Sequence, residues 1–230
     1  MATHRIHKSC CFLLAIIFCQ NLNATSHTDN WNSAIITGPI SKDKKFKYYI
    51  QPGLTFEDDH YKYRSSYLYL GVGYQTSPHV MMWLMNAWHN RVKASGKVLN
   101  IETIREQIDW NLIDDPSLNL TSISRFEQRK DTSQPQWLIR GREKLTLRIP
   151  FSSWPTHSFV TFDELYVNFN NPAWINNNSF FDINNIFVGV GTQLSPTVSF
   201  DLGYLNQYLL RTTGNKDNNV IYLMFFVALP

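Results

Sequence analysis

The stretch Trp137–Ile149, WLIRGREKLTLRI, alternates between basic and apolar side chains. In an extended chain, one face would carry the polar side chains Arg140, Arg142, Lys144, Thr146 and Arg148. The opposite face would carry Ile139, Leu145, Leu147 and Ile149, with Glu143 as the exception. Because side chains alternate between the two faces of a strand, this stretch predicts a β-strand with one charged face and one apolar face.

Similar alternation continues through the chain after residue 24, where we find no long stretch with helical spacing and caps. The predicted strands are Trp31–Ile40, Phe46–Phe56, Tyr63–Gln75, Val80–His89, Ile101–Ile113, Leu118–Arg129, Trp137–Ile149, Phe159–Phe169, Phe180–Leu194, Val198–Leu210 and Val220–Leu229. Turn clusters such as SKDKK, TSPH, DDPS and SSWPTH separate them. The sequence therefore predicts an all-β protein.

Strand length and aromatic placement favour a membrane barrel over a soluble sheet. Many of the segments reach the length of about 9–11 residues that a tilted membrane strand needs, and the turns alternate between short and longer. Aromatic residues near the segment ends fit interfacial girdles: Trp31, Trp88, Trp110, Trp137, Tyr67 and Tyr208. We predict an antiparallel transmembrane β-barrel of about 10–12 strands. A secreted soluble β-sandwich or lipocalin-like binding protein is the alternative.

The number of segments conflicts with the rule that closed antiparallel barrels have an even number of strands. A barrel of about ten strands results if Trp31–Ile40 lies outside it, and about twelve if one long segment is split. We favour twelve slightly.

The N-terminus has the layout of a secretory signal peptide. Arg5, His7 and Lys8 precede the apolar run Cys10–Cys19, which is too short for a membrane helix. We expect cleavage after Ala24, which leaves residues 25–230 as one barrel domain. All three cysteines lie in the signal, so the mature chain has no disulfide. The net charge of +3 is too small and too evenly spread to predict nucleic-acid binding.

Two similar stretches, GVGYQTSPHV (Gly71–Val80) and GVGTQLSPTV (Gly189–Val198), predict two hairpins. Their turns are formed by Ser77 and Pro78 in the first copy and by Ser195 and Pro196 in the second. Proline fixes φ within a turn, where its missing N–H is not needed. Both turns should lie at the same, periplasmic rim, with the neighbouring glycines facing the barrel interior.

The polar faces of three successive strands predict a charge network in the barrel lumen. Its members are Arg125, Glu127, Arg129, Arg140, Arg142, Arg148 and Glu164. Cross-strand arginine–carboxylate pairs satisfy one another where water is scarce, so we expect the network to plug and stiffen a narrow barrel. A selectivity or contact patch for an anionic solute is the second interpretation.

No catalytic or metal site is predicted. The arginines around Glu127 and Glu164 favour the ionised carboxylates, which are poor general acids. The cluster EDDH (Glu57–His60) is interpreted as a solvated loop in preference to a divalent-cation site, and no metalloprotease or serine-hydrolase motif is present. We therefore expect no enzyme activity and no cofactor, with an outer-membrane enzyme and a small anion-selective pore as alternatives.

Several stretches in order resemble the bacterial family catalogued as domain of unknown function 2490. They are SRFEQRK (Ser124–Lys130), LIRGREKLTLRIPF (Leu138–Phe151), TFDELYVNF (Thr161–Phe169), FFDINNIFVGVGTQLSP (Phe180–Pro196) and LGYLNQYL (Leu202–Leu209). The resemblance implies an outer-membrane β-barrel of Gram-negative bacteria without an established activity. Its partners would be outer-membrane lipid and, during insertion, the barrel-assembly machinery. The chain departs from the family pattern at Asn185, where Asn184 would be followed by arginine, so one lumenal charge partner is expected to be missing.

Overall fold

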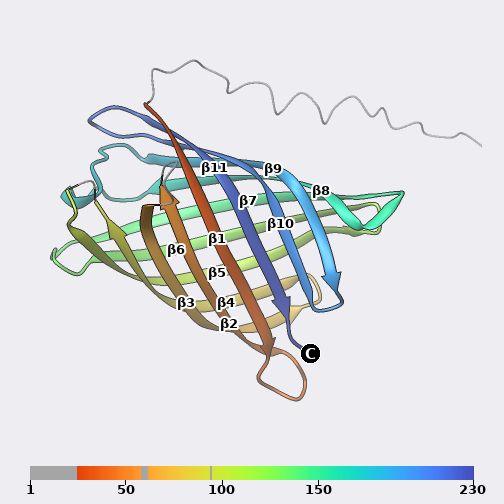
Figure 1. Ribbon diagram of the computed structural model, residues 1–230. Coiled ribbons are helices and arrows are strands. Elements are labelled where there is room, and N and C mark those ends of the chain that lie inside the picture. The colour runs from red at the N-terminus through yellow and green to blue at the C-terminus, as the bar shows by residue number, and fades with distance from the viewer. Residues whose placement is uncertain (1–24, 58–61, 94) are drawn as a thin grey trace, which may run out of the picture.

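The computed structural model describes residues 25–57, 62–93 and 95–230 and shows a single closed β-barrel (Figure 1). The described strands are β1 (Thr25–Pro39), β2 (Phe46–Glu57), β3 (Lys62–Ser77), β4 (Val80–Val92), β5 (Val98–Asp115), β6 (Leu118–Asp131), β7 (Trp137–Phe151), β8 (Trp154–Asn168), β9 (Phe181–Ser195), β10 (Val198–Leu209) and β11 (Lys216–Ala228). The predicted all-β barrel is confirmed. The predicted signal peptide and its cleavage site lie outside the described residues.

The described part of the chain closes into a barrel of eleven strands, so the expectation of ten or twelve is wrong. Neighbours in sequence pair antiparallel, whereas β1 and β11 pair in parallel, from Thr25 opposite Lys216 to Thr37 opposite Ala228. The even-number rule holds for barrels that are antiparallel throughout. One parallel seam between the first and last strands removes that constraint, and β1 is a full member of the sheet.

The two ends of the barrel differ in the length of their connections. At one end, two residues join the strands at positions 78–79, 116–117, 152–153 and 196–197, and six residues (40–45) join β1 to β2. At the other end lie the connections 93–97, 132–136, 169–180 and 210–215, each of five residues or more. We call these the short-turn end and the long-loop end. The predicted turn SSWPTH is wrong in extent, because Trp154 already pairs with Phe151 and His157 belongs to β8.

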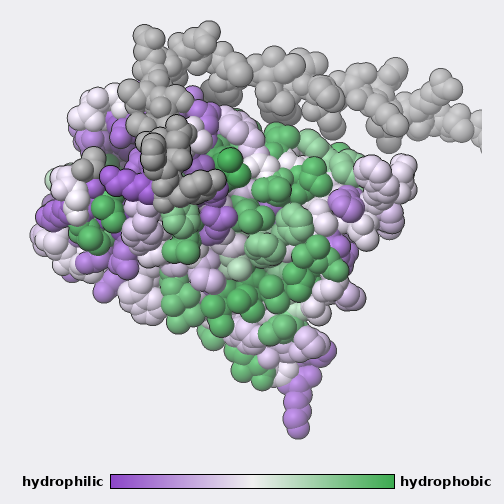
Figure 2. Space-filling view, in the orientation of Figure 1, coloured by the Kyte–Doolittle hydropathy of each residue, from purple (hydrophilic) through white to green (hydrophobic). Residues whose placement is uncertain are grey.

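Side chains alternate between the two faces of the barrel as predicted. On β7, Arg148 reaches Asp201 across the interior, whereas Leu145 and Ile149 are exposed on the outer surface. Figure 2 shows hydrophobic side chains over the middle of the visible face and hydrophilic ones toward both ends. Apolar surface is therefore concentrated in a belt around the barrel.

The predicted aromatic girdles are only partly correct. Trp88, Trp110 and Trp137 are exposed on the outer surface. Trp31 instead packs against the buried interior cluster around Phe187 and Tyr222, and Tyr67 packs against Tyr69 and the neighbouring interior cluster. The strands of the structure begin well before these residues, at Thr25 and Lys62, and the alternation on each strand turns Trp31 and Tyr67 inward.

Three carboxylates interrupt the apolar outer surface of β5, β7 and β8. Glu106, Glu143 and Asp163 are exposed, and each has apolar or small outward neighbours two residues away on its strand. Glu143 accepts a hydrogen bond from the Ser122 hydroxyl, and Asp163 accepts one from the Asn184 amide. Neighbouring strands thus provide polar partners for two of the three.

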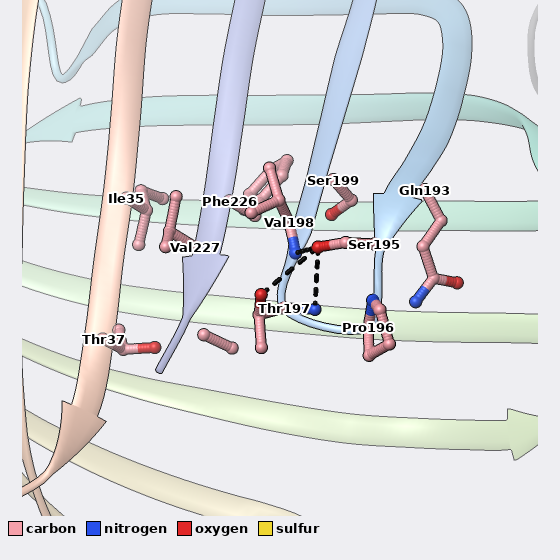
Figure 3. Close-up of a pocket in the computed structure, with 11 residues that line it drawn as sticks. Ile35, Thr37, Gln193, Ser195, Pro196, Thr197, Val198, Ser199, Phe226 and Val227 are labelled. Carbon is pink, nitrogen blue, oxygen red and sulfur yellow. Dashed lines mark hydrogen bonds between the residues drawn. The ribbon is translucent and has the colours of Figure 1, made fainter. Parts of the chain in front are cut away.

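Serine hydroxyls stabilise the two repeated turns, which both lie at the short-turn end. Ser195 Oγ accepts hydrogen bonds from the backbone N–H groups of Thr197 (3.3 Å) and Val198 (3.1 Å) (Figure 3). In the first copy, Ser77 Oγ accepts one from His79 N–H (3.3 Å). Serine satisfies donors in the tight turn while proline fixes φ, which explains why the dipeptide occurs twice.

The parallel seam gives a test of the strand order. Ala34 of β1 lies opposite Phe225 of β11. No cysteine follows Cys19, so the variant Ala34→Cys/Phe225→Cys made from residues 25–230 has no competing thiol. Directly paired residues have Cα atoms close enough for a disulfide, so we expect oxidation to crosslink most of the folded protein. Reduced and oxidised samples should differ in mobility on a denaturing gel.

The control for this crosslink is Ala34→Cys/Ile221→Cys, in which the second cysteine is four residues away on β11. We expect no crosslink in the control. Equal crosslinking of both pairs, or of neither, would contradict the parallel register.

Candidate functional site

Glu127 of β6 is the centre of a buried charge network inside the barrel. Its side chain is 0% exposed. It accepts hydrogen bonds from Arg105 Nε of β5 (2.9 Å), Arg140 Nε of β7 (3.0 Å) and Arg142 Nη1 of β7 (2.7 Å). In a single closed sheet, a fully buried side chain must point into the barrel. There, three guanidinium groups supply the hydrogen-bond donors that water would otherwise provide to the carboxylate.

Glu164 of β8 extends the network. It accepts hydrogen bonds from Arg142 Nη2 (2.7 Å), the Tyr166 hydroxyl (2.8 Å) and Asn185 Nδ2 (3.2 Å), and it forms an ion pair with Arg125. Arg142 therefore bridges Glu127 and Glu164. The arrangement holds both carboxylates between fixed cations and links four consecutive strands, β5 to β8.

Five of the seven predicted site residues come together in this way: Arg125, Glu127, Arg140, Arg142 and Glu164. The other two lie apart. Arg148 donates to both carboxylate oxygens of Asp201 (2.9 Å each) and to Ser158 Oγ (3.0 Å). Arg129 forms no ion pair in the described part of the chain and keeps one long hydrogen bond, from its Nε to Thr103 Oγ1 (3.4 Å).

Sequence reasoning missed Arg105, which pairs with Glu127, and the carboxylates Asp182 and Asp201. Arg105 was detectable from the alternation on β5, where Thr103, Arg105 and Gln107 share the buried face. Asp201 was detectable in the same way, from the alternation on β10, where Asp201, Leu205 and Gln207 share the buried face. Its partner Arg148, however, comes from β7. Alternation predicts the face on which a side chain lies, but not which side chain of a distant strand it contacts across the barrel.

The interior glycines make room for large neighbours. A Cβ atom on Gly191 would lie 1.9 Å from Nη1 of Arg148, so a larger residue there would displace the guanidinium group from its present position beside Asp201. Gly73 lies under the Trp83 ring and Gly189 under the Phe187 ring. Of these three, only Gly191 makes room for a charged group; aromatic side chains fill the space at the other two.

The other histidine and acidic candidates form no metal-binding cluster among the described residues. His89 faces the interior, with its ring edge-on to Tyr67 at 5.9 Å, while Asp58, Asp59 and His60 of the EDDH cluster lie outside the described residues. The described residues contain no group of three or more His, Cys, Asp or Glu side chains placed to hold a metal ion. Their one helical element is the three-residue turn η1 (Ala173–Ile175), and no described helix is long and apolar enough to cross a membrane.

Comparison with known families gives a match over residues 28–219 to the model described as a protein of unknown function, DUF2490. The chain belongs to this family. The resemblance predicted from the sequence motifs is therefore confirmed. At Asn185, where the family pattern led us to expect a missing charge partner, the DUF2490 chain described here places a buried amide. It donates to Glu164 and to the Tyr166 hydroxyl (3.1 Å) and accepts from Gln207 (3.1 Å).

Two further similarities were found for this DUF2490 protein. An uncharacterised protein of Methylorubrum extorquens is 27% identical over 124 residues, which are 53% of this chain and 54% of that protein. The chain thus spans about half the length of the curated relative that it matches. A solved NanC porin structure is similar with a TM-score of 0.48 and 11% identity, covering 83% of this chain and 94% of that one.

Proposed function

We propose that this protein spans the outer membrane of a Gram-negative bacterium as a narrow barrel closed by its own side chains. Glu127 carries this proposal, because three arginines from the strands on both sides meet it in the barrel interior. Barrels of about eight strands are filled by side chains, whereas barrels of about 16 leave an aqueous channel. Eleven strands with long arginines pointing inward fall nearer the filled case.

The outer surface supports the membrane location. Exposed Leu, Val, Ile and aromatic side chains form the belt, which suits the hydrocarbon region. The exposed carboxylates are tolerable, because Asp and Glu on the lipid-facing surface cost less than Arg or Lys. The proposed partners are outer-membrane lipid and, during insertion, the barrel-assembly machinery. The short turns would face the periplasm and the long loops the outside.

The proposed role is structural, without a catalytic residue. Glu127 and Glu164 are occupied as ion-pair partners of arginines, which favour the ionised carboxylates and make them poor general acids. A small anion-selective pore is the second candidate, favoured by the arginines at the long-loop end.

Conductance separates the two candidates. We expect purified protein in planar lipid bilayers to give little or no stable conductance, because the ion-paired network fills the interior. The measurement is single-channel current at fixed voltage in about 1 M salt, where surface charges are screened. A large, reproducible, ohmic conductance would overturn the closed barrel and support the pore.

The matched variant for this test is Glu127→Ser/Arg142→Ser/Glu164→Ser, which removes side-chain volume together with two negative charges and one positive charge. We expect it to conduct where the unmodified protein does not. Its folding can be checked by the difference in gel mobility between unboiled and boiled samples, and the conductance comparison uses only protein that passes this check.

A further inference from the structure

We propose that the long-loop end of the barrel holds a binding site for a small soluble anion that carries phosphate or carboxylate groups. The site is a cavity of about 220 Å³ enclosed by the ends of the strands and two of the long loops. We call it the vestibule. Five arginines line it: Arg64 (β3), Arg91 (β4), Arg129 (β6), Arg140 (β7) and Arg211 (loop 210–215).

Existing ion pairs neutralise only part of this charge. Asp182, the one carboxylate among the described lining residues, pairs with Arg211 (2.6 Å) and lies 3.8 Å from Arg140. Just outside the vestibule, Asp29 (2.8 Å) and Glu57 (3.2 Å) pair with Arg64.

Arg91 and Arg129 are left without a carboxylate partner in the described part of the chain. Neither appears in an ion pair, and neither is fully exposed to solvent. Glu127 attracts Arg129 through space, and Glu57 and Asp29 attract Arg91, but burial outweighs these attractions. A shielded cation without an ion-pair partner is unfavourable for folding, so two in one cavity suggest a role other than stability. The planar guanidinium group matches the oxygens of phosphate and carboxylate with two parallel hydrogen bonds.

Loop contacts shape the vestibule as a defined cavity. Trp174 and Ile175 of the β8–β9 loop line it, and Trp174 Nε1 donates to the Gln136 carbonyl of the β6–β7 loop (3.1 Å). Asn176 Nδ2 donates to Thr213 Oγ1 of the β10–β11 loop (3.0 Å). Three loops therefore hold one another across the mouth. The aromatic side chains of Trp31 and Trp174 also line the vestibule and give it an apolar surface, which suits an organic anion with an apolar part.

The vestibule lies next to the buried network, because Arg140 belongs to both. An anion bound there would occupy the space between the loops and Glu127 without having to pass through the barrel. Binding at this site therefore does not depend on whether the barrel conducts, and it can be tested on folded protein in detergent.

The experiment is a calorimetric titration of the folded full chain in non-ionic detergent at fixed ionic strength. Pyrophosphate tests the phosphate chemistry and citrate the carboxylate chemistry, with glucose as the uncharged probe. We expect saturable binding of at least one of the anions and none of glucose. The double variant Arg91→Gln/Arg129→Gln should weaken that binding by about tenfold or more, the loss of about 1.4 kcal/mol.

The matched control is Lys130→Gln, which removes one positive charge next to Arg129 on the opposite, outward face. It should bind the anion like the parent. A second readout separates binding from structure: without anion, the double variant should resist denaturant as well as the parent or better, because unpaired cations have been removed.

Three outcomes would overturn the vestibule as a binding site. They are no saturable binding of either anion, unchanged affinity in the double variant, and an equal loss in Lys130→Gln. A double variant that loses stability in step with affinity would likewise assign the two arginines a structural role.

Discussion

Replacing Glu127 with glutamine is expected to lower the free energy of unfolding by about 3–5 kcal/mol, the cost of breaking a buried ion pair by removing one partner. Glutamine keeps the shape of the side chain but not its charge. Arg105, Arg140 and Arg142 would remain in the interior, and Arg105 would lose its ion-pair partner. The measurement is the fraction folded against urea concentration in lipid vesicles, read from gel mobility of unboiled samples.

Glu143→Gln is the matched control for this experiment. Glu143 lies on the outward face of β7, where it accepts one hydrogen bond from Ser122. Removing its charge leaves no described cation without an ion-pair partner. We expect a change of less than about 1 kcal/mol, typical of an exposed polar contact. If the two variants lose similar stability, Glu127 is not the centre of the network.

A double variant tests whether the loss of stability in Glu127→Gln comes from the positive charge that is left without a partner. Adding Arg105→Met to Glu127→Gln removes the cation that has Glu127 as its ion-pair partner and replaces it with an apolar side chain of comparable length. Because an uncompensated charge costs more than a missing pair, we expect the double variant to be more stable than Glu127→Gln alone. Additive losses would show instead that packing is the main contribution of these side chains.

Alternation in the sequence was sufficient to predict which face the charged and apolar side chains of β7 occupy. Arg140, Arg142 and Arg148 face inward on β7, and Leu145 and Ile149 face outward, as the period of two requires. Alternation cannot predict which inward side chains meet, because that depends on the register and curvature of the closed sheet. Arg148 and Asp201 are 53 residues apart in sequence and lie on strands that are not neighbours.

Closure of the sheet was the other feature that local sequence could not supply. Each predicted segment corresponds to one strand, yet the parity rule led to ten or twelve strands. The rule assumes that the first and last strands run antiparallel, and nothing within Thr25–Pro39 or Lys216–Ala228 specifies the direction of their mutual pairing. Because parallel and antiparallel pairs both satisfy the backbone of the two edge strands, closure is decided by the whole barrel.

The proposed membrane location gives the second large expected effect. Leu145 lies near the middle of β7, on its outward face, with 46% of its surface exposed. Arginine at the bilayer midplane raises the free energy of folding into the membrane by about 2–4 kcal/mol, because its charge must lose its hydration or bring water into the hydrocarbon. We therefore expect Leu145→Arg to fold poorly into lipid vesicles.

Phe151→Arg serves as the depth control, since Phe151 is the last residue of β7 and is exposed on the same face at the short-turn end. Near the membrane interface the cost falls to about 0–1 kcal/mol, so this variant should fold almost as well as the parent. The measurement is the yield of the heat-sensitive folded form after dilution from urea into vesicles. A soluble β-sandwich or lipocalin-like protein would tolerate arginine at both exposed positions equally. Equal yields of the two variants would therefore reject the membrane barrel, whereas a loss confined to Leu145→Arg places the middle of β7 in hydrocarbon.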